Sequence, residues 1–566
     1  MYFLSTPQLR PGKSLTIFGI AGSTIAQIAP AFSFYFGMAV IAAGAGIGAP
    51  LVILVAAIAM TIVGFSVAAF AQKHPSNGSL VTFLGLSFGG VIGTATAVLF
   101  TAAYILLLAS VMLVVGGWVA DSLQSFYNIQ ISWIPLTIIF TVIAWFLTIS
   151  GIDRSTRVAT AAMIIEVAIL LLVSIFVIVN PPAQLSAAPF LPSSISNGLE
   201  GLGLGFPLAV FLFIGFENSV ALAEESEQPQ RNIPRAVLTS IGLMGLLYLI
   251  VAYCTVEGFG NNAAALAKSS IPFMDLAQKY LGGLAVLAAL AGFTSAAGTL
   301  LAGSNNLSRV IFNSAREGLF PAPLAQVSKR FGTPIVALTI PAILALAIAL
   351  IVGIGSGGWL TGYSYVSSLG SIPLIIIYGA INVAVIFYKP LGLSPLRRYV
   401  LPVIGLISIA IPFWALIQPG QPAPVNLFPW IVLVLLILAL LYSWWKVKTD
   451  PALPSRIGAT GPGALAEESF VETTVTASSV TNEEEVSESG SSLAASAATQ
   501  PEESAEVDKQ ATEAKELVQV AEAPQADQED DEQELAKVAE APQADQEGDA
   551  QEPDSAGTKD KAAQSE

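Results

Sequence analysis

The sequence predicts an all-α polytopic membrane protein with about twelve transmembrane helices. Three observations predict this fold. Of the 566 residues, 54% are hydrophobic and only 11% are charged, against about 25% charged residues in soluble proteins. The apolar residues come in runs near the roughly 20 residues that a helix needs to cross a bilayer. These runs do not alternate apolar and polar residues, as the strands of a membrane barrel would.

The apolar runs are the expected spans, and all of them fall within the first 450 residues. They lie near residues 14–43, 49–71, 88–117, 132–150, 157–180, 198–228, 232–258, 281–315, 335–354, 358–388, 398–418 and 427–446.

The basic residues predict how the spans are oriented, because cytoplasmic loops of membrane proteins are enriched in Lys and Arg. With the N-terminus in the cytoplasm, only Lys268 and Lys279 of the basic residues before position 450 fall outside. We therefore expect a plasma-membrane protein with both termini in the cytoplasm. The expected inner residues are Arg10, Lys13, Lys73, Arg154, Arg157, Arg231, Arg235, Arg309, Arg316, Lys329, Arg330, Lys389, Arg397, Arg398, Lys446 and Lys448.

The sequence divides into a transmembrane domain over residues 1–450 and a tail over residues 451–566. The first region has a net charge of +6 and the tail a net charge of −22. Ala, Glu, Ser, Gln and Asp dominate the tail, and VAEAPQADQE occurs twice in it, at 520–529 and 538–547. A segment with so little apolar surface does not offset the entropy lost on ordering. The expected tail is disordered, acidic and cytoplasmic.

The first span contains a predicted helix break. Gly19 and Gly22 weaken the helix, and Pro30 lacks a backbone donor and suits the first turn of a new helix. We therefore expect a half-helix from about Leu15, an unwound stretch over residues 23–29, and a second half-helix from Pro30.

The sixth span is expected to be broken as well, since Gly215 and the charged Glu217 lie in its middle. Non-helical backbone at membrane depth is tolerated only where it lines a cavity or is buried in protein. The first and sixth spans are five apart, which is the spacing of a five-plus-five inverted repeat. Interrupted helices at matching positions of two halves indicate the binding site of a transporter. The alternative is a pair of ordinary kinked helices.

The directions of the two breaks predict the chemistry of the substrate. The second half of the first span begins near the midplane, where the free N–H groups of a helix N-terminus favour an anion. The first half of the sixth span ends there, and its free carbonyls favour a cation. An α-amino acid satisfies both. The expected substrate-binding residues are Ser23, Thr24, Ile25, Ala26, Gln27, Ile28, Phe211, Phe213, Ile214, Gly215 and Glu217.

Three segments resemble the amino acid–polyamine–organocation permeases. FIGFENSVALAEESEQPQRNIPRAV at 213–237 is similar to their sixth-helix signature. Residues 304–338 resemble their eighth helix and the following loop, and HPSNGSL at 74–80 resembles the loop after their second helix. The resemblance covers most of residues 14–446 and none of the tail. It implies a five-plus-five inverted repeat with helices one and six broken, and secondary transport of amino acids.

Two carboxylates are expected deep within spans, and both are candidates for proton coupling: Glu217 in the sixth span and Glu166 in the fifth. A buried ionisable group costs about 2.5 kcal/mol or more and is a functional candidate by default. Burial favours the neutral, protonated carboxyl. The alternative for each is a structural hydrogen bond. Some relatives that the resemblance brings in carry a lysine at the position of Glu166, where it substitutes for a bound sodium.

Hydroxyl groups of Thr294 and Ser295 in the eighth span are the only candidates for a sodium site. Paired hydroxyl residues in membrane helices also bond to backbone carbonyls, which is the alternative. No other metal site is expected, because the chain has one cysteine and one histidine.

Charged residues at the end of the sixth span are expected to form a solvated ion network at an inner gate. They are Glu224, Glu225 and Glu227, followed by Arg231 and Arg235.

Three classes of function remain open. The first is a proton-coupled or exchanging amino-acid permease, whose partners are a small-molecule substrate, a proton or counter-substrate, and the lipid bilayer. The second is a permease for another amine, such as a polyamine, in which Glu217 is a counter-charge. The third is a membrane sensor that has kept a transporter fold. No nucleophile–base set indicates an enzyme, and neither a cofactor nor a nucleic-acid partner is expected.

Overall fold

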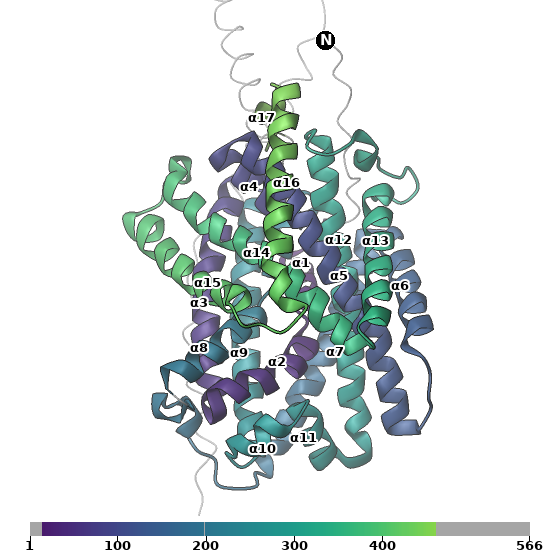
Figure 1. Cartoon of the computed structure of the whole chain (residues 1–566), viewed down its shortest axis with the longest axis vertical. Helices are drawn as coiled ribbons and strands as arrows, with labels where there is room; N and C mark the ends of the chain where they lie inside the picture. Colours follow the sequence, from purple (N-terminus) through teal and green to yellow (C-terminus); the bar gives the residue numbers. More distant parts are fainter. Residues whose placement is uncertain (1–13, 197, 460–566) are drawn as a thin grey trace, which may run out of the picture. The chain divides into compact units, whose positions relative to one another are not determined.

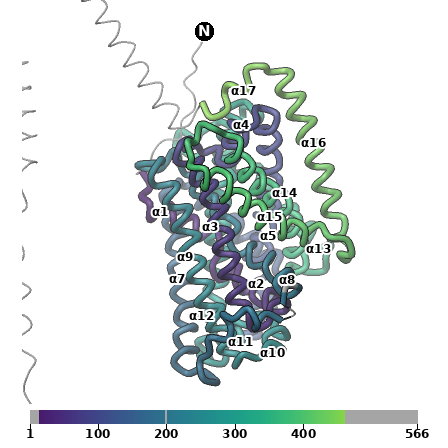
Figure 2. Tube along the Cα trace, turned by 90° about the vertical axis from the view of Figure 1, so that its left-hand side faces the viewer, coloured from purple at the N-terminus to yellow at the C-terminus, as the bar shows by residue number. Residues whose placement is uncertain are grey.

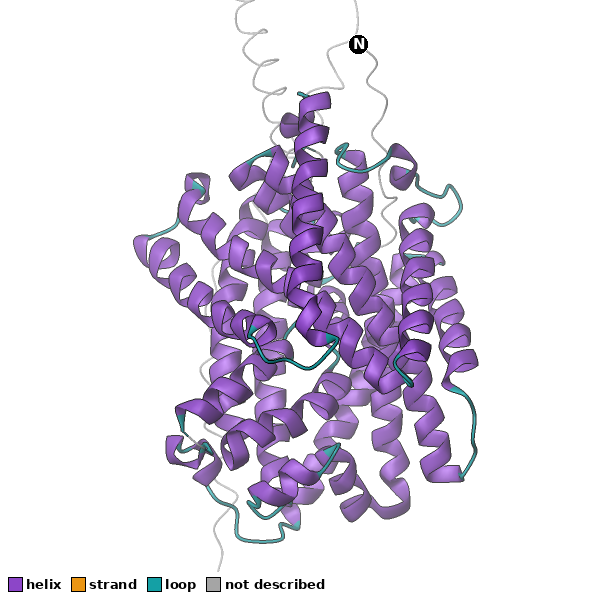
Figure 3. Ribbon diagram, in the orientation of Figure 1, coloured by secondary structure: helices purple, strands orange, loops and turns teal. Residues whose placement is uncertain are grey.

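The computed structural model describes residues 14–459 except residue 197, and this part of the chain is a bundle of helices without strands (Figures 1 and 3). In the first half the helices are α1 (Ile17–Ile28), α2 (Pro30–Ala45), α3 (Ala49–Lys73), α4 (Ser79–Phe88), α5 (Gly90–Tyr127), α6 (Trp133–Ile149) and α7 (Ile152–Val179). They are followed by α8 (Leu199–Phe211), the 3₁₀ helix η4 (Phe216–Glu225), α9 (Pro229–Gly258), α10 (Ala263–Lys268), α11 (Pro272–Leu281), α12 (Val286–Arg316), α13 (Ile335–Gly355), α14 (Trp359–Phe387), α15 (Leu401–Ile417), α16 (Phe428–Thr449) and α17 (Leu453–Arg456).

The predicted twelve passes are present in the described residues. Ten segments are long and apolar enough to cross a membrane, and the first of them, Ile17–Lys73, contains two passes, α1–α2 and α3. The remaining pass is α6, an apolar helix of 17 residues. The short helices α4, α10, α11 and α17 lie between or after the passes and were not predicted.

The order of elements is the same in the two halves of the fold: a broken pass followed by four continuous ones. The broken passes α1–α2 and α8–η4 run side by side in opposite directions, because α2 packs against α8 while α1 packs against η4 (Figure 2). A backbone hydrogen bond of 2.6 Å from Leu15 N to the Glu225 carbonyl joins the start of one to the end of the other. This arrangement is the expected inverted repeat, with its broken helices in the core.

The outer helices present apolar side chains to the surroundings. Ile343 and Ile351 of α13, Trp414 of α15, and Trp430 and Leu438 of α16 are all exposed. In water this surface would be unfavourable, whereas in a bilayer it meets hydrocarbon. By contrast, most side chains of η4 and α12 are buried.

Basic residues gather at one end of the bundle. Every described Lys and Arg except Lys268 and Lys279 lies at the end where α1 begins, which is the upper end in Figure 1. We call it the basic end. Arg10 and Lys13 lie outside the described residues.

Packing continues past residue 450. Leu453 and Ile457 are buried, and Ile457 fills the space beside Gly85 of α4 and Gly93 of α5. The Gly458 N–H donates to Glu317 Oε1 at the end of α12, at 2.9 Å. The folded part therefore extends at least to residue 459, and the rest of the predicted tail lies outside the described residues.

Candidate functional site

The break in the first pass is a single residue, Ala29. It has a left-handed conformation, with φ 61° and ψ 69°, between the end of α1 at Ile28 and the start of α2 at Pro30. The prediction of an unwound stretch over residues 23–29 is therefore wrong in its length. A proline disfavours the helical conformation only in the residue before it, and Gly22 remains helical, where its missing side chain lets Thr160 of α7 pack close.

The first-turn donors of α2 are already bonded. The Ala31 N–H donates to Glu166 Oε2 at 2.9 Å, and the Phe32 N–H donates to Ser295 Oγ at 3.1 Å. The Ser33 N–H donates to the Ala29 carbonyl at 2.8 Å. In this conformation the helix N-terminus that was expected to receive a substrate anion is capped by a carboxylate of the protein itself.

The break in the sixth pass is centred on Gly215, as predicted. Helix α8 ends at Phe211, and Gly215 has φ +106° before η4 begins. A side chain here would be strained and would also meet Gln27 of α1 about 3.0 Å away. Glycine is therefore required both by the backbone conformation and by the close approach of the two broken passes.

A cavity of about 350 Å³ lies beside both breaks, between α2, α5, α8 and α14. Five of the predicted binding residues line it: Gln27, Ile28, Phe211, Ile214 and Gly215. One wall is apolar and includes Phe32, Phe36, Leu107, Leu108, Val111 and Leu208. Hydroxyl groups come from Ser364, Ser367, Ser368 and Ser371 of α14, and the ring of Tyr363 on the same helix packs against Phe32 and Phe36. None of these lining residues is charged, and a site of this size is typical for a small organic ligand.

The other predicted binding residues lie outside the cavity lining. Ser23 accepts a hydrogen bond from Asn218 Nδ2 at 3.1 Å, and the hydroxyls of Thr24 and Ser219 are 2.7 Å apart. These two contacts fasten α1 to η4. The remaining members of this group, Ile25, Ala26 and Phe213, are buried in packing contacts.

Sequence reasoning missed the wall that α5 contributes and did not count side chains of α14 among the binding residues. The four serines of α14 follow one another at spacings of three, one and three residues, which places them on one helix face. That spacing was readable in the sequence. Tyr104 and the leucines of α5 carried no comparable signal, because they lie in a uniformly apolar run.

Glu217 is fully buried but does not face the cavity. Its carboxylate accepts hydrogen bonds from the Tyr104 hydroxyl of α5 and, at 2.6 Å, from the Tyr378 hydroxyl of α14. Gln27 Nε2 donates to the Tyr104 hydroxyl at 2.8 Å, and both Gln27 and Tyr104 line the cavity. Glu217 thus orients Tyr104 directly and Gln27 through Tyr104. Gln27 Oε1 has no hydrogen-bond partner in the part of the chain that the structure describes.

The two sodium candidates have other bonds in the structure. Thr294 donates to the Ala291 carbonyl at 3.1 Å, which is the alternative that was considered, and Ser295 accepts from Phe32. The part of the chain that the structure describes contains no group of three or more His, Cys, Asp or Glu residues placed to hold a metal ion.

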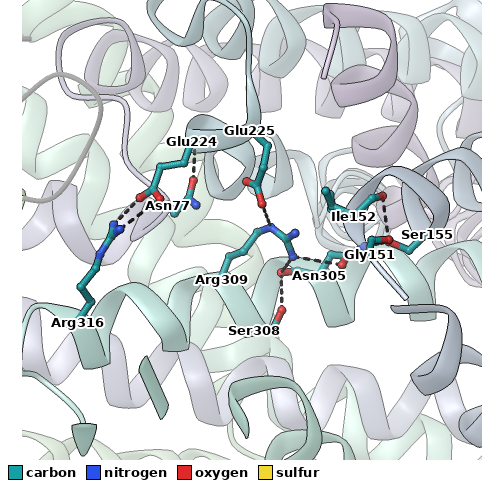
Figure 4. A network of polar contacts seen from close by, with 10 residues as sticks. All are labelled: Asn77, Gly151, Ile152, Ser155, Glu224, Glu225, Asn305, Ser308, Arg309 and Arg316. Atoms are coloured by element: carbon teal, nitrogen blue, oxygen red, sulfur yellow. Dashed lines mark hydrogen bonds and ion pairs between the residues drawn. The ribbon is translucent and has the colours of Figure 1, made fainter. Parts of the chain in front are cut away.

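A buried ion network lies at the basic end. Figure 4 shows Arg309 of α12 reaching Glu225 of η4, with a nitrogen–oxygen distance of 2.9 Å, and Arg316 reaching Glu224. Both arginines are at least 97% buried. A network at the end of the sixth pass was predicted, but its expected partners, Arg231 and Arg235, form no ion pair among the described residues. The cations come from α12, and the network is buried rather than solvated.

The sequence comparisons agree with this architecture. A family model described as "Amino acid permease" matches residues 13–441. The chain belongs to this amino acid permease family. Among its relatives, the branched-chain amino acid permease BcaP of Bacillus subtilis (strain 168) is 25% identical over 429 residues, covering 70% of this chain and 86% of the relative.

Two further relatives show how varied the family's cargo is. The methylthioribose transporter of the same organism is 24% identical over 401 residues, covering 66% of this permease and 81% of the relative. The D-serine/D-alanine/glycine transporter of Escherichia coli (strain K12) is 31% identical over 188 residues, covering 33% of this permease and 37% of the relative.

Proposed function

We propose that this permease is a secondary active transporter that carries amino acids across the membrane by alternating access. The observation that carries the proposal is the cavity beside two opposed helix breaks, with the network of Arg309 and Glu225 closing the basic end. Half-helices at a fixed midplane site with a closable path on one side are what alternating access requires.

The cavity supports a substrate with an uncharged side chain. Among the described residues that line it there is no Asp, Glu, Lys, Arg or His. A buried charge is costly unless it is paired, so a cationic or anionic side chain would have no partner here. Glu217 is not available as a counter-charge, because Tyr104 and Tyr378 hold its carboxylate outside the cavity. These features favour a neutral amino acid over a polyamine.

The apolar wall supports a large side chain. Phe32, Phe36 and Phe211 form its aromatic part, and Tyr363 of α14 packs against the first two rings. A branched-chain or aromatic amino acid would bury its side chain against the rings, and burial of apolar area is worth about 25 cal/mol per Å².

The proposed orientation places the basic end, and with it both ends of the transmembrane domain, in the cytoplasm of a cell whose plasma membrane holds the permease. We propose that α1, η4 and α12 close the cytoplasmic path in the described conformation. Substrate then approaches from the opposite end, where α2 and α8 flank the cavity. Transport is driven by a proton or by exchange with a counter-substrate.

A competition assay in reconstituted vesicles tests this function. Uptake of labelled leucine should be inhibited by excess unlabelled leucine, methionine and phenylalanine, and not by lysine, glutamate or spermidine. Inhibition by spermidine or lysine as strong as by leucine would reject the neutral substrate class. Absence of uptake for every amino acid would favour the sensor alternative.

A cavity-filling variant links that uptake to the site. Ser368→Trp places an indole in the cavity and should reduce leucine uptake at least tenfold, because ligand and ring compete for the same volume. Thr361→Trp is the matched control on the same helix, since Thr361 is exposed and lies outside the cavity lining. Equal uptake by the two variants at equal protein level would place the site elsewhere.

We also propose that the acidic tail is dispensable for transport. Its net charge of −22 should keep it away from an anionic inner leaflet. Truncation after Ala459 should leave uptake per folded molecule unchanged. Truncation after Asp450 should lower folded yield, because it removes the buried Leu453 and Ile457 and the bond to Glu317. A large loss of uptake in the longer truncate would show that the tail takes part in transport.

A further inference from the structure

We propose that Glu166 couples substrate binding to protonation by competing with the substrate carboxylate for the N-terminus of α2. This inference rests on the proposed function and assigns the coupling step to one side chain. In its ionised form Glu166 occupies the donors of α2. Once protonated, it releases them to the carboxylate of an amino acid in the cavity.

The hydrogen bonds at the start of α2 show how Glu166 occupies the donors of this helix. Glu166 is fully buried on α7, and its Oε2 accepts from Ala31 at 2.9 Å. Ser295 of α12 accepts from the next N–H, that of Phe32, and its hydroxyl is also hydrogen-bonded to the Glu166 carboxylate. Two successive donors of a 16-residue helix are therefore held, directly and through Ser295, by one carboxylate.

The contact between Glu166 and α2 lies beside the cavity, so a substrate carboxylate in the cavity can compete for the same donors. Ala29 and Phe32, on either side of Ala31, both line the cavity, as does Ser33. Glu166 approaches the same turn of α2 from the side of α7, outside the cavity. A backbone N–H makes one good hydrogen bond at a time, so a substrate carboxylate and Glu166 exclude each other at these donors.

The charge of Glu166 decides whether Glu166 or the substrate carboxylate occupies the donors of α2. The positive end of the α2 dipole stabilises one negative charge, and an ionised Glu166 already supplies it. A second carboxylate at the same place would add repulsion in a low-dielectric setting. A protonated Glu166 is neutral and accepts a hydrogen bond more weakly, so the substrate carboxylate replaces it. Glu166 Oε1, which has no hydrogen-bond partner among the described residues, offers a place for the proton.

The surroundings of Glu166 contain few other groups that titrate. Tyr35 of α2 donates to the Ala288 carbonyl at 2.9 Å, and Tyr248 of α9 also faces Glu166. Tyrosine hydroxyls stay neutral in the working range of a permease. Within the described residues Glu166 forms no salt bridge. No hydrogen bond or ion pair among the described residues joins Glu166 to the other titratable or charged groups on the helices packed against α7. These groups are Arg231, Arg235, Tyr253, Cys254, Glu257, Asp275, Lys279, Tyr280, Arg309 and Arg316.

The experiment compares ligands with and without a carboxylate. Equilibrium binding of leucine, methionine and phenylalanine to the full-length purified protein is measured between pH 5 and 8, together with binding of their amino alcohols. The amino alcohols keep the ammonium and the side chain. The amino acids should bind more weakly as pH rises, by up to about tenfold per pH unit once Glu166 is ionised. The amino alcohols should show no such dependence.

Glu166→Gln provides the second arm. The glutamine retains the shape of the side chain and is always neutral, so leucine affinity should become independent of pH and remain at the wild-type low-pH value. Equal pH dependence for leucine and leucinol in the wild-type protein would overturn the inference, even where Glu166→Gln fails to fold. An unchanged slope in a folded Glu166→Gln variant would overturn it as well. The proposed function fails separately, by the absence of uptake for any amino acid.

Discussion

Replacement of Arg309 by glutamine is expected to open the basic end of the permease. The substitution leaves the carboxylate of Glu225, which is 5% exposed, buried without its cation. Breaking a buried ion pair by removing one partner costs about 3–5 kcal/mol. An open conformation in which water reaches Glu225 avoids this cost, so the population of the described conformation relative to it should fall by roughly a hundredfold to several thousandfold.

Thiol labelling measures this opening. Cys254 is the only cysteine, and it is replaced by alanine before a cysteine is introduced at Ser308, which is buried beside the network. The label should react from the basic end much faster in Arg309→Gln than in the parent. Arg235→Gln is the matched control, since Arg235 lies exposed at the same end without an ion pair among the described residues.

A double variant distinguishes opening of the basic end from a general loss of folded structure. Glu225→Gln together with Arg309→Gln removes both charges and should restore slow labelling at least in part. If Arg309→Gln labels as slowly as Arg235→Gln, the ion network does not hold the gate closed.

Replacement of Glu217 by alanine is the second change with a large expected effect. It leaves the hydroxyls of Tyr104 and Tyr378 buried without an acceptor, at about 1–3 kcal/mol for each unsatisfied group. It also releases Gln27, which is held through Tyr104. Both folded stability and leucine uptake should fall strongly. Glu217→Gln retains one acceptor oxygen, so its losses should be intermediate.

The pH profile distinguishes the roles of the two buried carboxylates. The sequence makes Glu217 the first candidate for proton coupling, whereas its bonds to two tyrosines make it a positioning residue. Net uptake and counterflow are therefore measured against external pH. Glu217→Gln should transport less but keep the wild-type profile. Loss of the pH dependence in Glu217→Gln, with its retention in Glu166→Gln, would reverse this assignment.

The number and order of the passes could be predicted from the sequence because hydrophobic length is a local property. The same holds for the break at Gly215, where a glycine and a buried acid stand together in an apolar run. Pro30 marked the other break, although its effect is limited to Ala29.

The partners of the buried polar groups could not be predicted, because they are set by helices distant in the sequence. Glu166 and Ala31 are 135 positions apart, and Glu225 and Arg309 are 84 apart. The pattern of apolar residues along a span shows that a residue is buried, but it does not identify which other helix the residue contacts. The cavity wall from α5 was missed for this reason, and so were the arginines of α12 as partners of Glu224 and Glu225.

The single-residue break at Ala29 allows α1 to rotate as a rigid helix about a hinge that lines the cavity. Its 12 helical residues span about 18 Å at 1.5 Å per residue. The end of α1 far from this hinge lies beside Leu15, whose N–H donates to the Glu225 carbonyl at the basic end. A tilt of about 20° about the hinge would swing that end by roughly 6 Å. The hinge lies two residues before Ala31, whose N–H donates to Glu166. A movement of α1 at the basic end would then be centred next to the N–H groups that begin α2.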